Sequence, residues 1–162
     1  MPVSEDDQRH LRQAIGLAAE ARAGGNHPFG AVLVDGSGQV VAVARNSVVT
    51  GRDHTGHAET NLVRQVGTLM AEGGLDPATS TLYTSTEPCA MCAGAIYWSG
   101  VGRVVYALAE ADLLAMTGDD HPGNPTLALP CRQVFAAGSH AVVVDGPALE
   151  DEARVVHDGF WS

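Results

Sequence analysis

The chain has 162 residues, of which 45% are hydrophobic and 17% charged, and its mean hydropathy is +0.03. These values fit one folded domain over residues 1–162 and exclude a low-complexity chain and a membrane protein. Nineteen acidic residues outnumber nine basic ones, all of them unclustered arginines, so the formal net charge is -10. That charge disfavours nucleic acid, whose phosphates need a basic surface, and favours a small neutral or cationic substrate.

The N-terminus and the cysteines indicate a cytoplasmic protein. The first ten residues, MPVSEDDQRH, are acidic and polar, so they lack the basic and apolar regions of a secretory signal. The chain has three cysteines, an odd and small number that disfavours a disulfide framework and suits a reducing compartment. We therefore expect a cytoplasmic location and no membrane partner.

The first 45 residues predict one helix followed by a β-hairpin. Ser4, with Asp7 three residues later, is typical of a helix N-cap, and apolar residues then recur at helical spacing, which predicts a helix over 5–23. Two β-branched runs flank the turn sequence DGSG and predict strands over 30–35 and 39–45.

The middle of the chain alternates between helix and strand. Apolar residues repeat every three to four positions over 57–70, which predicts a helix, and TLYTST predicts a strand over 81–86. Pro88 suits the first position of a helix that ends at Gly100, and a further strand is expected over 102–108. This alternation indicates the α/β class, with a mostly parallel sheet and helices packed on it.

The C-terminal third gives a weaker signal. Residues 117–130, TGDDHPGNPTLALP, predict a long loop, which in a compact domain is usually functional or a linker. A fifth strand is expected over 140–146, and a last helix over 147–161. Trp161 lies almost at the terminus, where residues are usually polar and loose, so we expect it to be buried against the pocket or a partner subunit.

Three residues from two predicted helix starts have the chemistry of a zinc site. Cys89 and Cys92 are three apart, so their sulfurs face one point, and the helix N-terminus favours their thiolate forms. His57, at the start of the preceding helix, supplies a third ligand. His54 is a rival ligand that lacks a glutamate in register, and Cys131 has no visible partner, so we assign these two to a loop and to packing.

A glutamate beside the predicted metal indicates catalysis. Zinc prefers about four ligands, and a site with three protein ligands keeps one position open for water, whose pKa the metal lowers to near neutrality. Glu59, two residues after His57, is close enough to take a proton from that water and pass it on. We therefore predict zinc at His57, Cys89 and Cys92 with Glu59 as the proton carrier.

His-x-Glu followed by Pro-Cys-x-x-Cys is the signature of zinc deaminases that act on nucleobases. The chain resembles the cytidine deaminase-like superfamily over most of its length, and HPFGAVLVD, ARN, HAET, LYTSTEPCAMCAGAIYW and YALAEAD are most similar to bacterial guanine deaminases. The resemblance implies a three-layer α/β/α sandwich around a five-stranded mixed, mostly parallel sheet. It also implies one zinc per subunit and a homodimer, in which residues 147–162 dock on or cross to the partner subunit.

The resemblance also implies roles for residues around the substrate. Phe29 would stack near the base, Asn46 would hydrogen-bond it, and the backbone at Ala58 would meet a ring carbonyl. Phe160 and Trp161 match an aromatic end that closes the pocket. For Phe29 the alternative is a core position, and for Asn46 it is a turn at the end of a strand.

Asp112 matches an acidic residue that, in the family, works on protons beside the glutamate. The plain alternative is a surface acid in the run AEAD. Both interpretations remain open from the sequence.

These features predict a zinc-dependent aminohydrolase that acts on a free nucleobase or nucleoside, with guanine to xanthine plus ammonia as the first choice. Alternatives within the class are cytosine, cytidine or another aminated heterocycle such as a triazine or pterin. A tRNA adenosine deaminase is a further alternative, which the acidic charge disfavours. A structural zinc module without catalysis would need a fourth side-chain ligand, and the candidates His54 and Cys131 lack the motif spacing.

Overall fold

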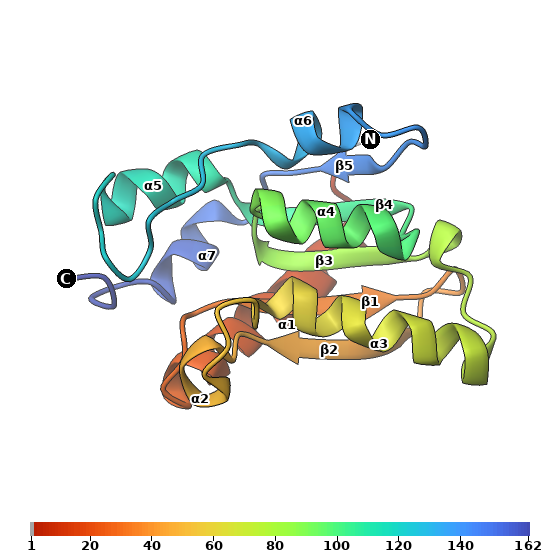
Figure 1. Cartoon of the computed structure of the whole chain (residues 1–162), viewed down its shortest axis with the longest axis horizontal. Coiled ribbons are helices and arrows are strands. Elements are labelled where there is room, and N and C mark those ends of the chain that lie inside the picture. Colours follow the sequence, from red (N-terminus) through yellow and green to blue (C-terminus); the bar gives the residue numbers. More distant parts are fainter. Residues whose placement is uncertain (1) are drawn as a thin grey trace.

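The computed structural model describes residues 2–162 and contains one five-stranded sheet in the order β2-β1-β3-β4-β5 (Figure 1). The strands are β1 (Gly30–Val34), β2 (Val40–Arg45), β3 (Thr81–Thr86), β4 (Arg103–Leu108) and β5 (Val143–Asp145). The helices are α1 (Glu5–Ala23), α2 (Val48–Gly51), α3 (Ala58–Gly73), α4 (Ala90–Ser99), α5 (Glu110–Thr117), α6 (Cys131–Ala136) and α7 (Glu150–Val155), with a 3-10 turn at Pro77–Thr79.

Helices cover both faces of the sheet, which confirms the predicted three-layer fold. In Figure 1, α3 and α4 lie side by side in front of the strands, and α1 lies behind them. The buried residues form two clusters, one on each face. The cluster behind the sheet includes Leu11, Ala14, Val32, Tyr83, Val105 and Ala153, and the cluster in front includes Leu33, Leu62, Val66, Ala93, Ile96 and Phe135. None of the helices in residues 2–162 has the length and apolarity needed to cross a membrane.

The strand directions explain where the functional residues gather. β1 pairs antiparallel with both β2 and β3, whereas β3, β4 and β5 are parallel to one another. The sheet is therefore mixed as predicted, although only two of its four pairs are parallel, because the β1–β2 hairpin adds an antiparallel edge. The carboxyl ends of β3 and β4 meet at one edge, where Thr86 pairs with Leu108.

Several element boundaries differ from the prediction. The last helix spans only Glu150–Val155, and Pro88 lies just before α4, whose N-cap is Cys89. Three helices, α2, α5 and α6, were not predicted. Helix α6 follows directly on the segment 117–130, which is an irregular loop as expected apart from its first residue, Thr117, which ends α5.

The C-terminal segment packs on its own chain. Ala153 of α7 is fully buried in the cluster behind the sheet. Arg22 of α1 donates hydrogen bonds to the carbonyl oxygens of Val156 and Asp158, at 2.9 and 2.7 Å. Trp161 is 8% exposed, which confirms that it is buried. The segment thus docks on α1 and the sheet within a single chain.

A buried ion pair fixes α1 to the sheet. Asp7 is 4% exposed and accepts hydrogen bonds from Arg103 at 2.8 and 3.0 Å and from the Tyr83 hydroxyl at 2.7 Å. It also completes the capping box with Ser4. Burial opposes ionisation of Asp7, but the hydrogen bonds from Arg103, Ser4 and Tyr83 outweigh it and lower its pKa.

We expect Asp7→Asn to lower the free energy of unfolding by about 3 kcal/mol at neutral pH, because it leaves Arg103 without one of its buried partners. The pKa of Asp7 is lower in the folded than in the unfolded chain, so this contribution is present above about pH 4 and is lost as the pH falls below it. The difference between the two proteins should therefore shrink in acid. Urea denaturation at several pH values measures both effects.

The matched control is Asp6→Asn, one residue away. Asp6 pairs with Arg9 at 2.8 Å, but both side chains are more than two-thirds exposed, so its loss should change stability little. Equal destabilisation by the two substitutions would show that the buried pair contributes nothing specific.

Candidate metal and active site

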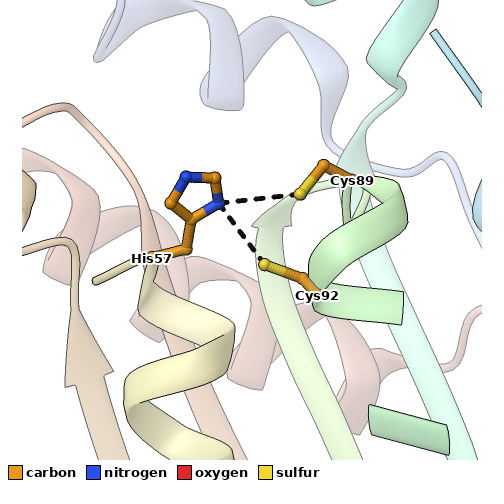
Figure 2. A group of neighbouring side chains, drawn as sticks. All are labelled: His57, Cys89 and Cys92. Atoms are coloured by element: carbon orange, nitrogen blue, oxygen red, sulfur yellow. Dashed lines mark hydrogen bonds between the residues drawn. The ribbon is translucent and has the colours of Figure 1, made fainter. Parts of the chain in front are cut away.

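The three predicted metal ligands meet at one point. His57 is the N-cap of α3 and Cys89 the N-cap of α4, with Cys92 in the first turn of α4. Figure 2 shows the imidazole pointing from the start of α3 toward both sulfurs. The Nδ1 atom of His57 lies 3.6 Å from Cys89 Sγ and 3.4 Å from Cys92 Sγ. Within residues 2–162, this trio is the one group of three or more such side chains close enough to share an ion.

The spacing of these atoms fits zinc. Tetrahedral zinc with ordinary bond lengths separates a histidine nitrogen from a thiolate sulfur by about 3.6 Å. Both observed separations agree with that value, and all three ligand atoms lie within 4.8 Å of one another. Two sulfurs and one imidazole are also a donor set that zinc prefers. His54, the rival ligand, lies outside the group.

The electrostatic surroundings favour a thiolate at Cys89. A hydrogen bond from Cys92 lowers the pKa of the Cys89 thiol to about 4, against the opposing effect of burial, and His57 adds to the lowering. A thiolate is the form that binds metal, so the site needs little proton release to take up zinc at this position.

Glu59 is buried beside the trio. It is 5% exposed, and its Oε1 accepts a hydrogen bond from the Thr84 hydroxyl at 2.7 Å. Its Oε2 lies 3.5 Å from Cys92 Sγ, which donates to it. Burial raises the pKa of this carboxyl group, and the nearby Cys89 charge raises it further. Glu59 thus points at the metal position while Thr84 holds its other oxygen.

A cavity of about 500 Å³ opens over the trio. Its volume lies within the range of small-molecule sites. His57, Cys89 and Glu59 line it, together with two of the predicted substrate residues, Phe29 and Asn46. The remaining lining residues are His27, Val48, His54, Thr86, Glu87, Met91, Glu110, Leu113 and residues 122–127.

Phe29 and Asn46 both line the cavity. Asn46 is 3% exposed, and its side-chain oxygen accepts the Val48 N–H at 3.1 Å, which leaves its amide N–H₂ group to donate. Phe29 is half-buried, and its ring lies 5.5 Å from that of His157 and 6.2 Å from that of Trp161. Both residues therefore present one side to the cavity and are held in place on the other.

Ala58 and Trp161 lie behind the cavity wall. The Ala58 side chain is fully buried in the core, so its predicted role concerns only the backbone at the start of α3. Trp161 does not line the cavity. Its ring packs 5.6 Å from His27 and its indole N–H donates to His157 at 3.0 Å. Trp161 therefore supports the cavity residues from behind.

Asp112 does not reach the cavity. It is part of α5, where its carboxylate pairs with Arg154 at 3.2 Å on a partly exposed surface. Glu110, two residues earlier, lines the cavity instead and is 8% exposed. Burial raises the pKa of Glu110 to about 8, and the charges of Cys89 and Glu59 contribute. Besides Glu59, the acidic side chains that line the cavity are therefore Glu87 and Glu110, neither of which the sequence identified.

Two threonines were also missed. In a strand, alternate residues share one face, so Thr84 and Thr86 point the same way. Thr84 holds Glu59, and the buried hydroxyl of Thr86, which lines the cavity, has no hydrogen-bond partner within residues 2–162. The period of two in TLYTST could have placed both threonines on the cavity side.

A three-ligand metal position with a fourth position open and a buried carboxylate beside it is the arrangement of a zinc-dependent hydrolytic enzyme. Residues 4–108, well over half of the chain, match the family described as "Cytidine and deoxycytidylate deaminase zinc-binding region". The chain belongs to this family and is a zinc-dependent deaminase. The predicted zinc and enzyme class are thereby confirmed.

Individual relatives differ in their substrates. The chain is 45% identical over 160 residues to a "Probable cytosine deaminase" of Schizosaccharomyces pombe, a match that covers 98% of this chain and 94% of the relative. It is 41% identical over 111 residues to a "Guanine deaminase" of Bacillus subtilis, covering 68% and 69% of the two chains. A solved structure of guanine deaminase from Nitrosomonas europaea superposes with a TM-score of 0.71 at 27% identity, covering 95% of this chain and 82% of that one.

Proposed function

We propose that the chain hydrolyses the amino group from a free nucleobase and releases ammonia. The observation that carries the proposal is the position of Glu59, which is buried beside the metal trio and lines the cavity. Phe29 offers a ring face to that cavity and Asn46 a hydrogen-bond donor.

The reaction adds water to the carbon that bears the amino group, breaks the bond from that carbon to nitrogen, and leaves a carbonyl. His57, Cys89 and Cys92 would hold the zinc, which when bound supplies a nucleophile at neutral pH by lowering the pKa of water. Glu59 accepts one proton of the attacking water and delivers it to the ring nitrogen. It then carries the second proton, from the newly formed hydroxyl group, to the departing amine as the carbonyl forms. Its hydrogen bond with Thr84 orients the carboxylate for both transfers.

We assign to Glu110 the role that the resemblance implied for Asp112, which is to work on protons beside Glu59. It lines the same cavity and interacts electrostatically with Glu59 and Cys89. Burial is the largest cause that raises the pKa of Glu110, to about 8, and a protonated carboxyl group at this position can donate a hydrogen bond to the substrate.

Cytosine is the first substrate to test and guanine the second. The relative that matches along nearly its whole length is named for cytosine, which moves the first choice away from guanine. Guanine stays a candidate because of the segments that resemble guanine deaminases and the solved structure of one. A tRNA substrate is disfavoured by the net charge of -10.

A structural zinc module is the competing function. It would need a fourth protein ligand, but within residues 2–162 the group around the metal position contains three. The trio also opens to a cavity, whereas structural sites are closed.

Ammonia release from a panel of substrates tests the proposal. We expect kcat/KM to be at least about a hundredfold higher for cytosine or guanine than for cytidine, guanosine and adenine. The panel should also include a triazine, a pterin and a tRNA transcript. If only the tRNA were deaminated, or if no compound released ammonia from zinc-loaded protein, the proposed function would be wrong.

The homodimer and the cytoplasmic location are part of the same proposal. The three cysteines form no disulfide with one another, which is consistent with a reducing compartment. Sedimentation of the purified chain would measure the oligomeric state.

A further inference from the structure

Both ends of one segment of the cavity wall reach the same side chain. The segment begins at Glu110, the first residue of α5, and ends at Cys131, the first residue of α6. We call residues 110–131 the wall segment, because Leu113 and residues 122–127 within it line the cavity. Its two ends meet at Glu87, which lies between β3 and Cys89.

Each oxygen of the Glu87 carboxylate accepts one backbone hydrogen bond from the wall segment. Oε2 accepts from the Glu110 N–H and Oε1 from the Cys131 N–H, each at 3.0 Å. Glu87 itself is 6% exposed, and its own N–H donates to the Leu108 carbonyl at 2.7 Å. The carboxylate is therefore fixed to the sheet and bonded on both sides.

Within residues 2–162, these two N–H groups have no other hydrogen-bond acceptor. Each belongs to the first residue of a helix, where no acceptor within the helix exists. The preceding residues, Ala109 and Pro130, make no side-chain cap. A buried N–H without an acceptor is costly, so Glu87 satisfies both helix starts at once.

The middle of the wall segment is held loosely. No residue from 118 to 130 is buried. One hydrogen bond, between the His121 ring and the Trp161 carbonyl at 2.7 Å, ties it to the C-terminal segment. The position of residues 122–127 over the cavity therefore depends mainly on where the two ends are fixed.

We propose that Glu87 is a positioning residue that holds both ends of the wall segment against the Cys89 turn and so sets the wall of the substrate cavity. We call this pair of hydrogen bonds to Glu87 the clamp. The clamp is a structural inference, whereas its effect on turnover rests on the proposed function. Cys131 serves this arrangement by packing: its side chain is fully buried, and burial and the Glu87 charge raise the pKa of its thiol to about 12.

Glu87→Gln is the sharpest test, because glutamine has the same shape but only one acceptor oxygen. One of the two N–H groups must then face an N–H₂ group. We expect a rise of about tenfold in KM with a fall of less than about threefold in kcat, as a loosened wall binds substrate less well. Hydrogen exchange should become faster at Glu110, at Cys131 and through 118–130, while β3 and the zinc content stay unchanged.

Asp76→Asn is the matched control. The Asp76 carboxylate also accepts a backbone N–H at a helix start, from Ala78 at 3.0 Å, but it lies outside the cavity. We expect it to leave KM and the exchange of residues 110–131 unchanged. If Glu87→Gln does not fold, hydrogen exchange in the wild-type chain still tests the proposal. In the wild type, we expect the Glu110 and Cys131 amides to exchange far more slowly than the amides of residues 118–130.

Three results would overturn the proposal. The first is unchanged exchange of the wall segment in Glu87→Gln. The second is loss of zinc from that variant, which would mean that Glu87 acts on the metal ligands. The third is rapid exchange of the Glu110 and Cys131 amides in the wild type. If no substrate is ever turned over, the proposed function fails, but the exchange measurements still test the clamp.

Discussion

Replacing Glu59 by glutamine should reduce turnover by about a thousandfold, because the amide cannot carry protons between water, ring and leaving amine. The substitution keeps the shape of the side chain and an oxygen that can accept from Thr84, at 2.7 Å in the wild type. Zinc should therefore remain bound. Single-turnover ammonia release and metal analysis on the same sample measure both quantities.

Glu72→Gln provides the control for this substitution. Glu72 is on the same helix, α3, but it is exposed and far along the chain from the trio. Its replacement should leave kcat and zinc content as in the wild type. A Glu59→Gln enzyme with wild-type turnover would remove Glu59 from the mechanism and leave Glu110 as the proton carrier to be tested.

Replacing Cys89 by alanine should abolish both metal binding and activity. With two ligands left, the zinc content should fall from one ion per chain to less than about a tenth. The protein should also melt at a lower temperature, because bound metal stabilises the folded state. Inductively coupled plasma analysis and thermal denaturation with and without added zinc measure these effects.

Cys131→Ala is the matched cysteine control. Cys131 is fully buried but lies outside the metal trio, so this variant should lose some stability and keep its zinc. If both cysteine variants lost zinc equally, the metal would not be held by the pair at the start of α4.

The metal site could be predicted because each of its ligands lies at a helix start that neighbouring residues in the sequence mark. Cys89 and Cys92 are one helical turn apart, and Pro88 and the apolar residues after them mark the start of α4. His57 marks the start of α3 in the same way. Two helix starts that carry metal-binding side chains are expected to meet when both helices pack on the same face of the sheet. Helices α3 and α4 pack in this way.

The two helices at the ends of the wall segment, α5 and α6, were not predictable for a physical reason. Residues 110–117 and 131–136 form helices whose first N–H groups are satisfied by Glu87, and not by a capping residue next to them in the sequence. Local signals for a helix start were therefore missing. Only the folded chain brings the distant carboxylate to both ends.

Helix geometry explains why Glu110 faces the cavity and Asp112, the residue predicted from the sequence, does not. Residues two apart on a helix point about 200° away from each other, so only one of the two acids can face the cavity. Because Glu110 is the first residue of α5 and its N–H is held by Glu87, the helix is oriented with Glu110 inward and Asp112 toward Arg154. The sequence showed two acids but not the rotation of the helix.

The packing of α3 against α4 has a consequence for zinc affinity. The starts of these helices carry the ligands, and behind them Ala58, Leu62, Ala93 and Ile96 are fully buried in one shared cluster. A bulkier side chain at Ala93 should push α3 and α4 apart. The distance between the His57 nitrogen and the two cysteine sulfurs, which the ion must bridge, would then increase. We therefore expect interior residues that have no donor atom of their own to influence how tightly this enzyme retains its metal.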